Sequence, residues 1–181
     1  PLMVVGEKIY AANGDRKLYA IGKTDGTQRW VIDIGDEVRQ SPTVVGANIY
    51  LATQNGTIVS IIDQGNSAAQ QWTRQLPNSS PITAIKAVGN KLFVGMNEAG
   101  INKLYVIDRS NGSLIKNRPF NGTMLAPAIA GNTIYVAGQQ LSAQDVDNID
   151  ITLWQLNPNS GVTTPPVFVY PGQKAIAELF F

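Results

Sequence analysis

The sequence predicts an all-β protein, a β-propeller made of four-stranded antiparallel blades. One sequence pattern is repeated four times. It consists of a proline, an apolar run ending in glycine, an apolar strand with an aromatic residue, a turn, another apolar strand, a glycine turn and a last strand. The aromatic residues lie 40, 43 and 42 positions apart, and they are Tyr10, Tyr50, Phe93 and Tyr135. A period of about 40 residues with four strands per copy is typical of propeller blades.

The glycines of the second turn keep the same spacing, and they are Gly26, Gly65, Gly112 and Gly161. We therefore expect one propeller segment with blades at about residues 1–38, 39–78, 79–124 and 125–171. Residues 172–181 fit either the opening strand of a fifth repeat or a closing strand.

The first copy illustrates how each element is assigned. Residues 2–5 are continuously apolar, which predicts an inner strand packed on both faces. Strands are expected at 9–12, 18–21 and 28–32. The turns between them contain Asn-Gly and Asp-Gly, which tolerate positive φ. Residues 33–41 then lead to the next inner strand.

The other three copies follow the same order. The second predicts strands at residues 43–45, 48–51, 57–61 and around 71–72. The third predicts strands at 82–88, 92–95 and 104–108, then a turn at 111–114. The fourth predicts strands at 128–130, 133–136, 152–156 and 167–169. Repeated hairpins without helical periodicity indicate an all-β chain.

Composition excludes several kinds of chemistry. The 181 residues contain no His and no Cys, which rules out Ser-His-Asp hydrolysis, thiolate or imidazole metal sites, and disulfides. Charged residues are 15% of the chain, against about 25% in typical proteins, and the net charge is +1 without a basic cluster. That argues against a nucleic-acid partner. The absence of Cys fits an extracytoplasmic protein, in the periplasm or at the cell surface. No apolar run is long enough to span a membrane.

Residues 18–21, followed by Asp25-Gly26 and Trp30, resemble the repeat of pyrroloquinoline-quinone-type (PQQ-like) propellers. Residues 104–108 with Asn111-Gly112 match the same repeat. In the third copy, we expect Leu114 or Ile115 to replace the usual Trp, and in the fourth copy Trp154 has moved to the third strand. The resemblance covers nearly the whole chain.

The resemblance implies that the Trp of each blade docks against the neighbouring blade. We therefore expect a structural role for the residues at fixed positions of the repeat: Trp30, Trp72, Gly26, Gly112, Tyr10, Tyr50, Phe93 and Tyr135. Family members usually close with seven or eight blades, so the four repeats are expected to be part of such a ring. A closed four-bladed ring and an eight-bladed ring formed from two chains are the alternatives.

An unusual loop is expected at residues 139–150, where Asp145, Asp147 and Asp150 place three carboxylates close together. Ca²⁺ prefers several oxygen ligands, so the three could form a metal site. The loop lacks the glycine and the final Glu of an EF-hand, so a solvated hairpin extension is the favoured interpretation of this segment. No catalytic or other cofactor-binding residue is predicted.

These observations favour a non-catalytic propeller that binds a protein partner at the cell envelope or surface. Arg39–Ser41 and Asn78–Ser80 lie in loops that join blades and could touch a ligand. One alternative is a fragment of a PQQ-dependent dehydrogenase. In that family the resemblance implies a calcium held by Glu, Asn and Asp, an Asp base and a disulfide, and the disulfide cannot form without Cys. A second alternative is an extracellular sensor or adhesin module.

Overall fold

In the computed structural model, the described residues are 1–120, 123–124, 128–130, 133–142, 145–156 and 168–173, and side chains are described within residues 1–119. These residues form antiparallel sheets and one short 3-10 helix, η1 (Pro77–Ser79). No helix in this part of the chain is long and apolar enough to cross a membrane. The all-β prediction is confirmed.

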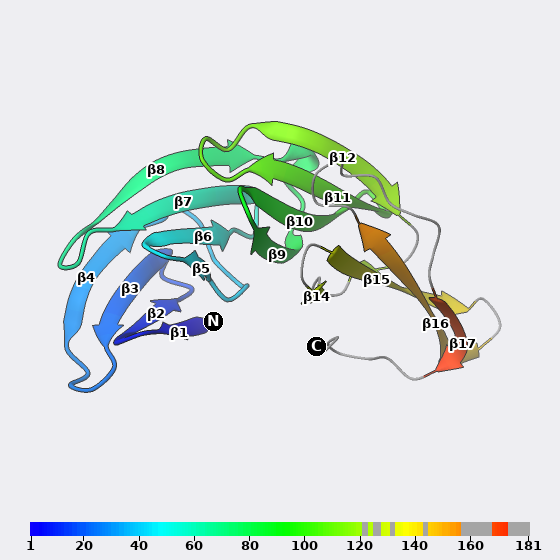
Figure 1. Ribbon diagram of the computed structural model, residues 1–181, viewed down its shortest axis with the longest axis horizontal. Helices are drawn as coiled ribbons and strands as arrows, with labels where there is room; N and C mark the ends of the chain where they lie inside the picture. Colours follow the sequence, from blue (N-terminus) through cyan, green and yellow to red (C-terminus); the bar gives the residue numbers. More distant parts are fainter. Residues whose placement is uncertain (121–122, 125–127, 131–132, 143–144, 157–167, 174–181) are drawn as a thin grey trace. The chain divides into compact units, whose positions relative to one another are not determined.

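The described residues form four sheets, blades 1 to 4 (Figure 1). Consecutive strands pair in blades 1 to 3, whereas the first two strands of blade 4 both pair with its third strand. The first strand of blade 4 lies within residues 79–124, which were expected to form the third blade. Blade 1 contains β1 (Leu2–Val5), β2 (Lys8–Ala12), β3 (Lys17–Gly22) and β4 (Gln28–Asp33). Blade 2 contains β5 (Thr43–Val45), β6 (Asn48–Ala52), β7 (Thr57–Asp63) and β8 (Ala68–Gln75). Blade 3 contains β9 (Ile82–Val88), β10 (Lys91–Glu98), β11 (Ile101–Asp108) and β12 (Leu114–Phe120). Blade 4 contains β13 (Thr123–Met124), β14 (Ala128–Ala130), β15 (Thr133–Ser142), β16 (Asp145–Leu156) and β17 (Phe168–Gln173).

The chain divides into two compact units. Unit 1 comprises Pro1–Ile82 with the short segment Ser110–Ser113, and unit 2 comprises Thr83–Arg109 with Leu114–Phe181. Unit 1 thus holds blades 1 and 2 together with the last turn of blade 3.

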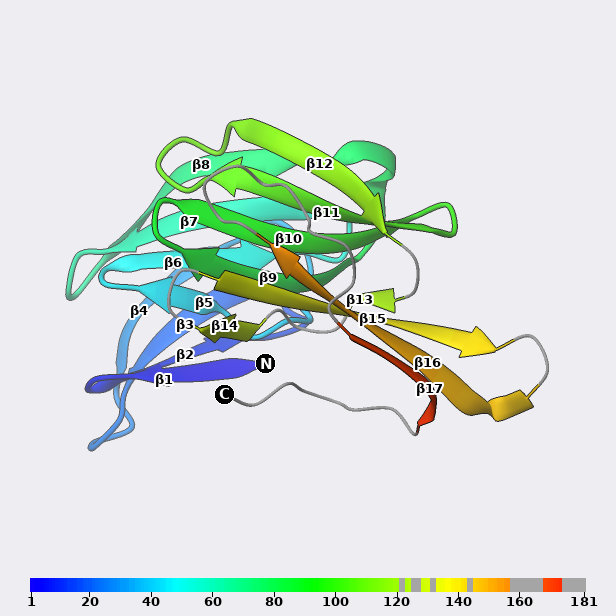
Figure 2. The same ribbon diagram turned by 45° about the vertical axis from the view of Figure 1, so that its right-hand side comes forward.

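Blades 1 and 2 pack face to face within unit 1, with β1 against β5 and β4 against β8 (Figures 1 and 2). Side chains alternate between the two faces of a strand, so each blade has two faces. The contact face of blade 1 is buried and consists of Tyr10, Ala12, Leu18, Ala20 and Trp30. It covers a face of blade 2 that is formed by Val44, Ile49, Leu51, Val59 and Ile61.

The prediction that the first strand is packed on both faces is wrong. Leu2 is 61% exposed and Val4 is 47% exposed. Both residues lie in register with Ala11 and Ile9, on the face of blade 1 opposite to its contact face. No described residue of unit 1 covers them, and β1 pairs with β2 alone.

Asp63 joins the two blades of unit 1 through a buried hydrogen-bonded centre. Its carboxylate accepts two bonds of 2.8 Å from Lys8 Nζ, one of 2.6 Å from the Tyr10 hydroxyl and one of 3.2 Å from Trp30 Nε1. The amide of Gly65 donates a further bond of 2.7 Å. The three side-chain donors belong to blade 1 and the acceptor belongs to blade 2, so this centre locks one blade to the next.

The contacts at this centre shift two pKa values in opposite directions. Burial by itself raises the pKa of Asp63, but the hydrogen bonds from Lys8, Tyr10, the Gly65 amide and Trp30 outweigh it and lower that pKa below its ordinary value. Burial, and then the bond to the Asp63 carboxylate, raise the pKa of the Tyr10 phenol well above its ordinary value. Both shifts keep the carboxylate ionised and the phenol protonated.

A second aromatic contact joins blade 2 to the last turn of blade 3. The Trp72 ring lies against Gly112, so close that a Cβ on this glycine would stand 2.6 Å from the ring. Gly112 also has φ 73°, a conformation that favours glycine. Tyr50 packs on Trp72 with ring centroids 6.0 Å apart, much as Tyr10 packs on Trp30 at 5.9 Å.

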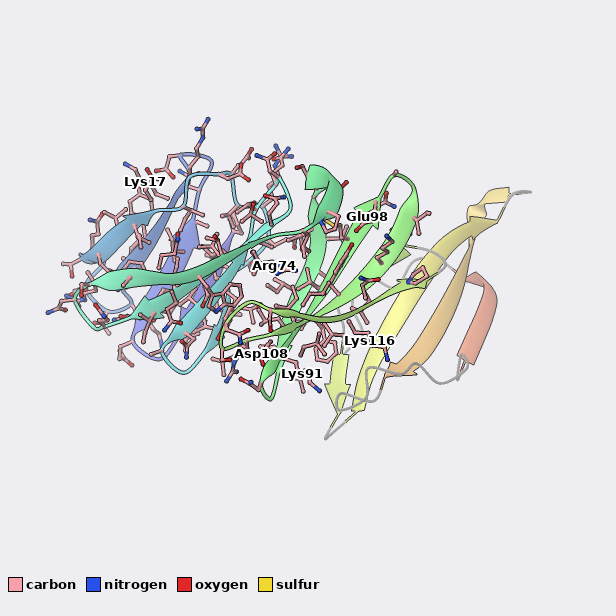
Figure 3. All side chains as sticks on the ribbon, turned by 90° about the horizontal axis from the view of Figure 1, so that it is seen from above. Lys17, Arg74, Lys91, Glu98, Asp108 and Lys116 are labelled. Atoms are coloured by element: carbon pink, nitrogen blue, oxygen red, sulfur yellow. The ribbon has the colours of Figure 1, made fainter. Side chains whose placement is uncertain are left out.

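Blade 3 keeps the sheet but not the tryptophan. Its core within unit 2 contains Phe93, Leu104 and Val106. Val106 pairs with Lys116, just as Ala20 pairs with Trp30, so Lys116 occupies the tryptophan position (Figure 3). The expectation that Leu114 or Ile115 takes this place is wrong. The bulge between Val106 and Ile107 also occurs in blades 1 and 2, between Ala20 and Ile21 and between Ser60 and Ile61. Lys116 accordingly follows Gly112 by four residues, just as Trp30 follows Gly26.

At residues 139–150 the structure has the hairpin extension that was the favoured interpretation of this segment. Strands β15 and β16 extend through this region, where Gln139 pairs with Ile151 and Gln140 with Asp150. The segment is therefore an elongated hairpin rather than an irregular loop.

We predict that Gly112→Ala lowers the free energy of unfolding by about 2–4 kcal/mol. The reason is a left-handed conformation that costs about 1–2 kcal/mol for a residue with a Cβ, together with a clash against a rigid indole ring. Gly26→Ala is the matched control, because Gly26 has φ 66° but no atom within 4 Å of the added Cβ. It should cost only about 1–2 kcal/mol. Equal losses in urea unfolding would show that Trp72 does not press on Gly112.

We also predict that Asp63→Asn lowers the free energy of unfolding at neutral pH by about 2–4 kcal/mol, because Lys8 loses its anionic partner. Since folding lowers the pKa of Asp63, its contribution is present above the unfolded pKa of about 3.9 and disappears as the pH falls through the folded value. The difference between wild type and variant should therefore shrink in acid. Urea unfolding of both proteins as a function of pH measures it, and a constant difference would contradict the assignment.

Candidate binding surface

The loop face is the end of blades 1 and 2 at which three connections meet. These are the turn at residues 13–16, the blade-joining loop at 33–41 and the turn at 53–56. They share one end because β2 and β6 run toward it, and because β4 is antiparallel to β3 and ends there. The blade-joining loop includes Arg39, which the sequence placed in a position to contact a ligand.

Asp36 fastens the blade-joining loop to blade 2. Its carboxylate accepts a 2.7 Å bond from the amide of Glu37 and a 3.1 Å bond from the amide of Asn55. The amide of Gln54 donates to the Glu37 carbonyl at 2.8 Å, and Val38 forms a β-bridge with Thr53. The loop is therefore held by backbone as well as side-chain bonds.

Electrostatics reinforce this attachment. Burial alone raises the pKa of Asp36, but hydrogen bonds from Thr53 and from the Asn55 and Glu37 amides more than compensate. The nearby charge of Arg16 acts in the same direction, and the pKa of Asp36 ends below its ordinary value. The carboxylate that anchors the loop is therefore ionised at neutral pH.

Beside this anchored segment, the loop face exposes charged groups. Glu37 and Arg39 form an ion pair of 3.2 Å, with side chains that are 39% and 64% exposed. Asp15 in the neighbouring turn accepts a bond from the Tyr19 hydroxyl and is exposed. A rigid backbone with solvated charges on it suits recognition of another macromolecule better than chemistry on a small substrate.

In unit 2, the equivalent turn of blade 3 is held differently. Glu98, whose side chain is 5% exposed, accepts a 2.6 Å bond from Lys103 across the β10–β11 hairpin (Figure 3). Asn97 and Asn102 bond side chain to side chain at 2.8 Å. The turn itself uses Ala99 and Gly100, both with positive φ. The charges of Glu98 and Lys103 therefore stabilise the β10–β11 hairpin.

Two of the predicted site regions remain untested. Asp145, Asp147 and Asp150 lie in β16, but their side chains are outside the described part of the chain. Asn78 belongs to η1, and its side chain is likewise not described. Within the part whose side chains are described, no three His, Cys, Asp or Glu residues gather into a group that could hold a metal ion.

A structural role for the residues at fixed positions of the repeat stays a prediction, and the side chain of Tyr135 lies outside the described part of the chain. Trp30 is 5% exposed, and Tyr10, Tyr50 and Phe93 are all buried. Sequence reasoning missed Asp63 and Asp36, the two carboxylates that organise unit 1. A hint lay in the repeat itself, because Asp63 stands where the other copies have Lys23 and Arg109.

Solved structures share this fold at low sequence identity. BamB from Moraxella catarrhalis is 19% identical with a TM-score of 0.62, over 91% of this chain and 49% of that one. The quinohemoprotein alcohol dehydrogenase from Comamonas testosteroni is 16% identical with a TM-score of 0.70, over 96% and 35%. Sqt1 from Saccharomyces cerevisiae is 13% identical with a TM-score of 0.73, over 94% and 46%. The chain thus spans half or less of each of these proteins, which share its propeller fold.

No curated protein matches the sequence at a significant level. The family described as outer membrane protein assembly factor BamB, by contrast, matches residues 1–169. This match covers all four repeats and agrees with the PQQ-like sequence pattern around Trp30 and with the four antiparallel sheets. The chain therefore belongs to the BamB-like family of PQQ-repeat propellers.

Proposed function

We propose that this chain is a non-catalytic propeller scaffold that binds a protein partner through its loop face. The observation that carries the proposal is the contrast within the blade-joining loop. Asp36 is ionised and fully engaged in holding the backbone, while Glu37 and Arg39 beside it are exposed. The loop is ordered before any partner arrives, and its charges are available.

Such an arrangement favours association for two physical reasons. A preformed loop avoids the entropic cost of ordering on binding. Exposed charges at the rim of an interface select the partner and speed the encounter, while contributing modestly to affinity. The Glu37–Arg39 pair presents both signs of charge, which orients a partner that carries the complementary pattern.

Family membership directs the proposal toward the cell envelope. The matching family is described as an outer membrane protein assembly factor, and a Cys-free chain suits an oxidising compartment. We therefore place this protein outside the cytoplasm, in the periplasm or at the cell surface, where it supports assembly of other proteins.

The dehydrogenase hypothesis has weaker support. The alcohol dehydrogenase and a europium-containing methanol dehydrogenase, the latter 13% identical with a TM-score of 0.69, share the fold with this chain. Sequence identities as low as these indicate a shared fold but not a shared activity. Calcium binding at Asp145, Asp147 and Asp150 stays a prediction, and a sensor or adhesin role has no specific observation in its favour.

A complementation experiment tests the proposal. In the organism of origin, deletion of the gene should lower the abundance of outer membrane proteins, and the wild-type gene should restore it. The double charge swap Glu37→Arg with Arg39→Glu should fail to restore it, because like charges facing the partner weaken binding by about tenfold or more. The swap keeps the ion pair itself and hence the fold.

The control is the swap Asp25→Arg with Arg29→Asp, at the 2.8 Å ion pair of a turn at the other end of blade 1. This variant should restore outer membrane proteins fully. Equal behaviour of the two swaps would remove the loop face from the proposal. Unchanged outer membrane proteins in the deletion strain would remove the scaffold function.

A further inference from the structure

Gln75, the last residue of β8, bonds through its side chain to the turn at residues 53–56 of the loop face. Its Nε2 donates to the Asn55 carbonyl at 2.7 Å and to the Leu76 carbonyl at 3.1 Å. Its Oε1 accepts a bond of 2.6 Å from the Thr57 hydroxyl. This side chain therefore ties the outer strand of blade 2 to the loop face.

The backbone on either side of this contact is fixed by the sheet. Gln75 pairs with Thr57, and the next residue, Leu76, is only 2% exposed. The Leu76 amide donates to the Gly56 carbonyl at 2.9 Å. Although Gln75 itself is exposed, only its side-chain torsions remain to be restricted by the bond to Asn55.

Asn55 is held from two sides. Its amide donates to the Asp36 carboxylate at 3.1 Å, and its carbonyl accepts the bond from Gln75. The same carboxylate accepts a 2.7 Å bond from the Glu37 amide. A series of hydrogen bonds therefore leads from the outer strand of blade 2, through the turn, to the loop that carries Glu37 and Arg39.

Bond lengths indicate that Gln75 is the main restraint on the peptide between Asn55 and Gly56. The nitrogen of this peptide donates to the Thr53 carbonyl at 3.2 Å, which is longer than the usual value of about 2.9–3.0 Å. Its oxygen accepts the 2.7 Å bond from Gln75. Gly56 has φ 77° and no side chain, so this peptide would rotate easily without the bond.

The equivalent positions of the neighbouring blades do not form this contact. The strand registers place Asp33 of blade 1 and Pro119 of blade 3 at the position of Gln75. The Asp33 carboxylate accepts a 2.8 Å bond from the Gly35 amide, and a proline side chain has no hydrogen-bond donor. Among blades 1 to 3, the contact thus belongs to the blade whose turn receives Asp36.

We propose that Gln75 is a positioning residue of the loop face. It fixes, through Asn55 and Asp36, the loop that presents Glu37 and Arg39, and it does not itself contact the partner. The statement about the partner rests on the proposed function, whereas the fixing of the loop does not. Among the described residues, Gln75 bonds to neither member of the ion pair, so it acts through the backbone.

Hydrogen exchange of the purified chain tests the positioning. Gln75→Ala should speed exchange of the Asn55 and Glu37 amides, which both donate to Asp36, by about fivefold or more. Amides of β6 and β7 should keep their rates, which shows that the sheet is intact. Gln70→Ala is the matched control and should change neither set, because Gln70 is an exposed glutamine of the same strand without a side-chain bond among the described residues.

Restoration of outer membrane proteins in the deletion strain separates positioning from direct contact. Gln75→Ala and Asp36→Asn should each restore only partly, and Gln70→Ala should restore fully. The double variant of Gln75 and Asp36 should lose less than the product of the two separate losses, because both residues act on one loop. A full product of the losses would show that Gln75 contacts the partner independently, and the proposal would be wrong.

The two readouts distinguish this inference from the proposed function. Unchanged exchange at Asn55 and Glu37 in Gln75→Ala would overturn the positioning, whatever the cells show. Full restoration by Gln75→Ala would also overturn it, provided that the charge swap at Glu37 and Arg39 fails to restore. If the charge swap restores fully, the proposed function is wrong, and the exchange rates alone decide whether Gln75 fixes the loop.

Discussion

The structure of unit 1 depends on one polar centre set in an apolar junction, the carboxylate of Asp63. A four-stranded sheet with two apolar faces cannot exist alone in water, so each blade needs a neighbour on each side. Apolar packing supplies most of the favourable energy but is non-directional. The bonds from Lys8, Tyr10 and Trp30 to one carboxylate supply direction, because only one placement of blade 1 on blade 2 satisfies all of them.

The next junction solves the same problem by shape instead of charge. At Gly112 the backbone comes close enough to the Trp72 ring to exclude any side chain. The tryptophan is common to both junctions, whereas the residue that faces it varies. Blade 3 departs from the pattern altogether, with Lys116 at the tryptophan position and Phe93 in place of a tyrosine. The two junctions of unit 1 therefore differ in their chemistry.

The acidic residues of unit 1 have different roles at different places in the fold. Asp63, with a side chain that is 6% exposed, works inside the junction, where it is saturated with donors and closed to ligands. Asp36 works at the loop end, where it fixes the backbone on which Glu37 and Arg39 stand in solvent.

The sequence by itself determined the blades. The 40-residue period, the apolar strands and the Asn-Gly and Asp-Gly turns are local signals, and local signals specify strands and hairpins. The resemblance to PQQ-like propellers also implied that Trp30 and Trp72 are blade contacts. The place of Lys116 was misjudged, although Lys116 follows Gly112 by four residues just as Trp30 follows Gly26, and the bulge that sets this spacing is common to blades 1 to 3. At 139–150 the favoured hairpin extension agrees with the structure, because polar residues pair in strands when their hairpin partner is in register.

Only the tertiary structure decided what each polar residue does. Lys8 and Asp63 are 55 residues apart in the chain, and the sequence around neither residue predicts the bond between them. Likewise, Asp36 and Asn55 meet only because two blades bring their loops to the same end. Burial of the first strand could not be inferred either, because an apolar run reads the same whether its face is covered or open. Contacts between distant segments depend on how sheets pack, and packing is fixed by the whole fold rather than by any stretch of sequence.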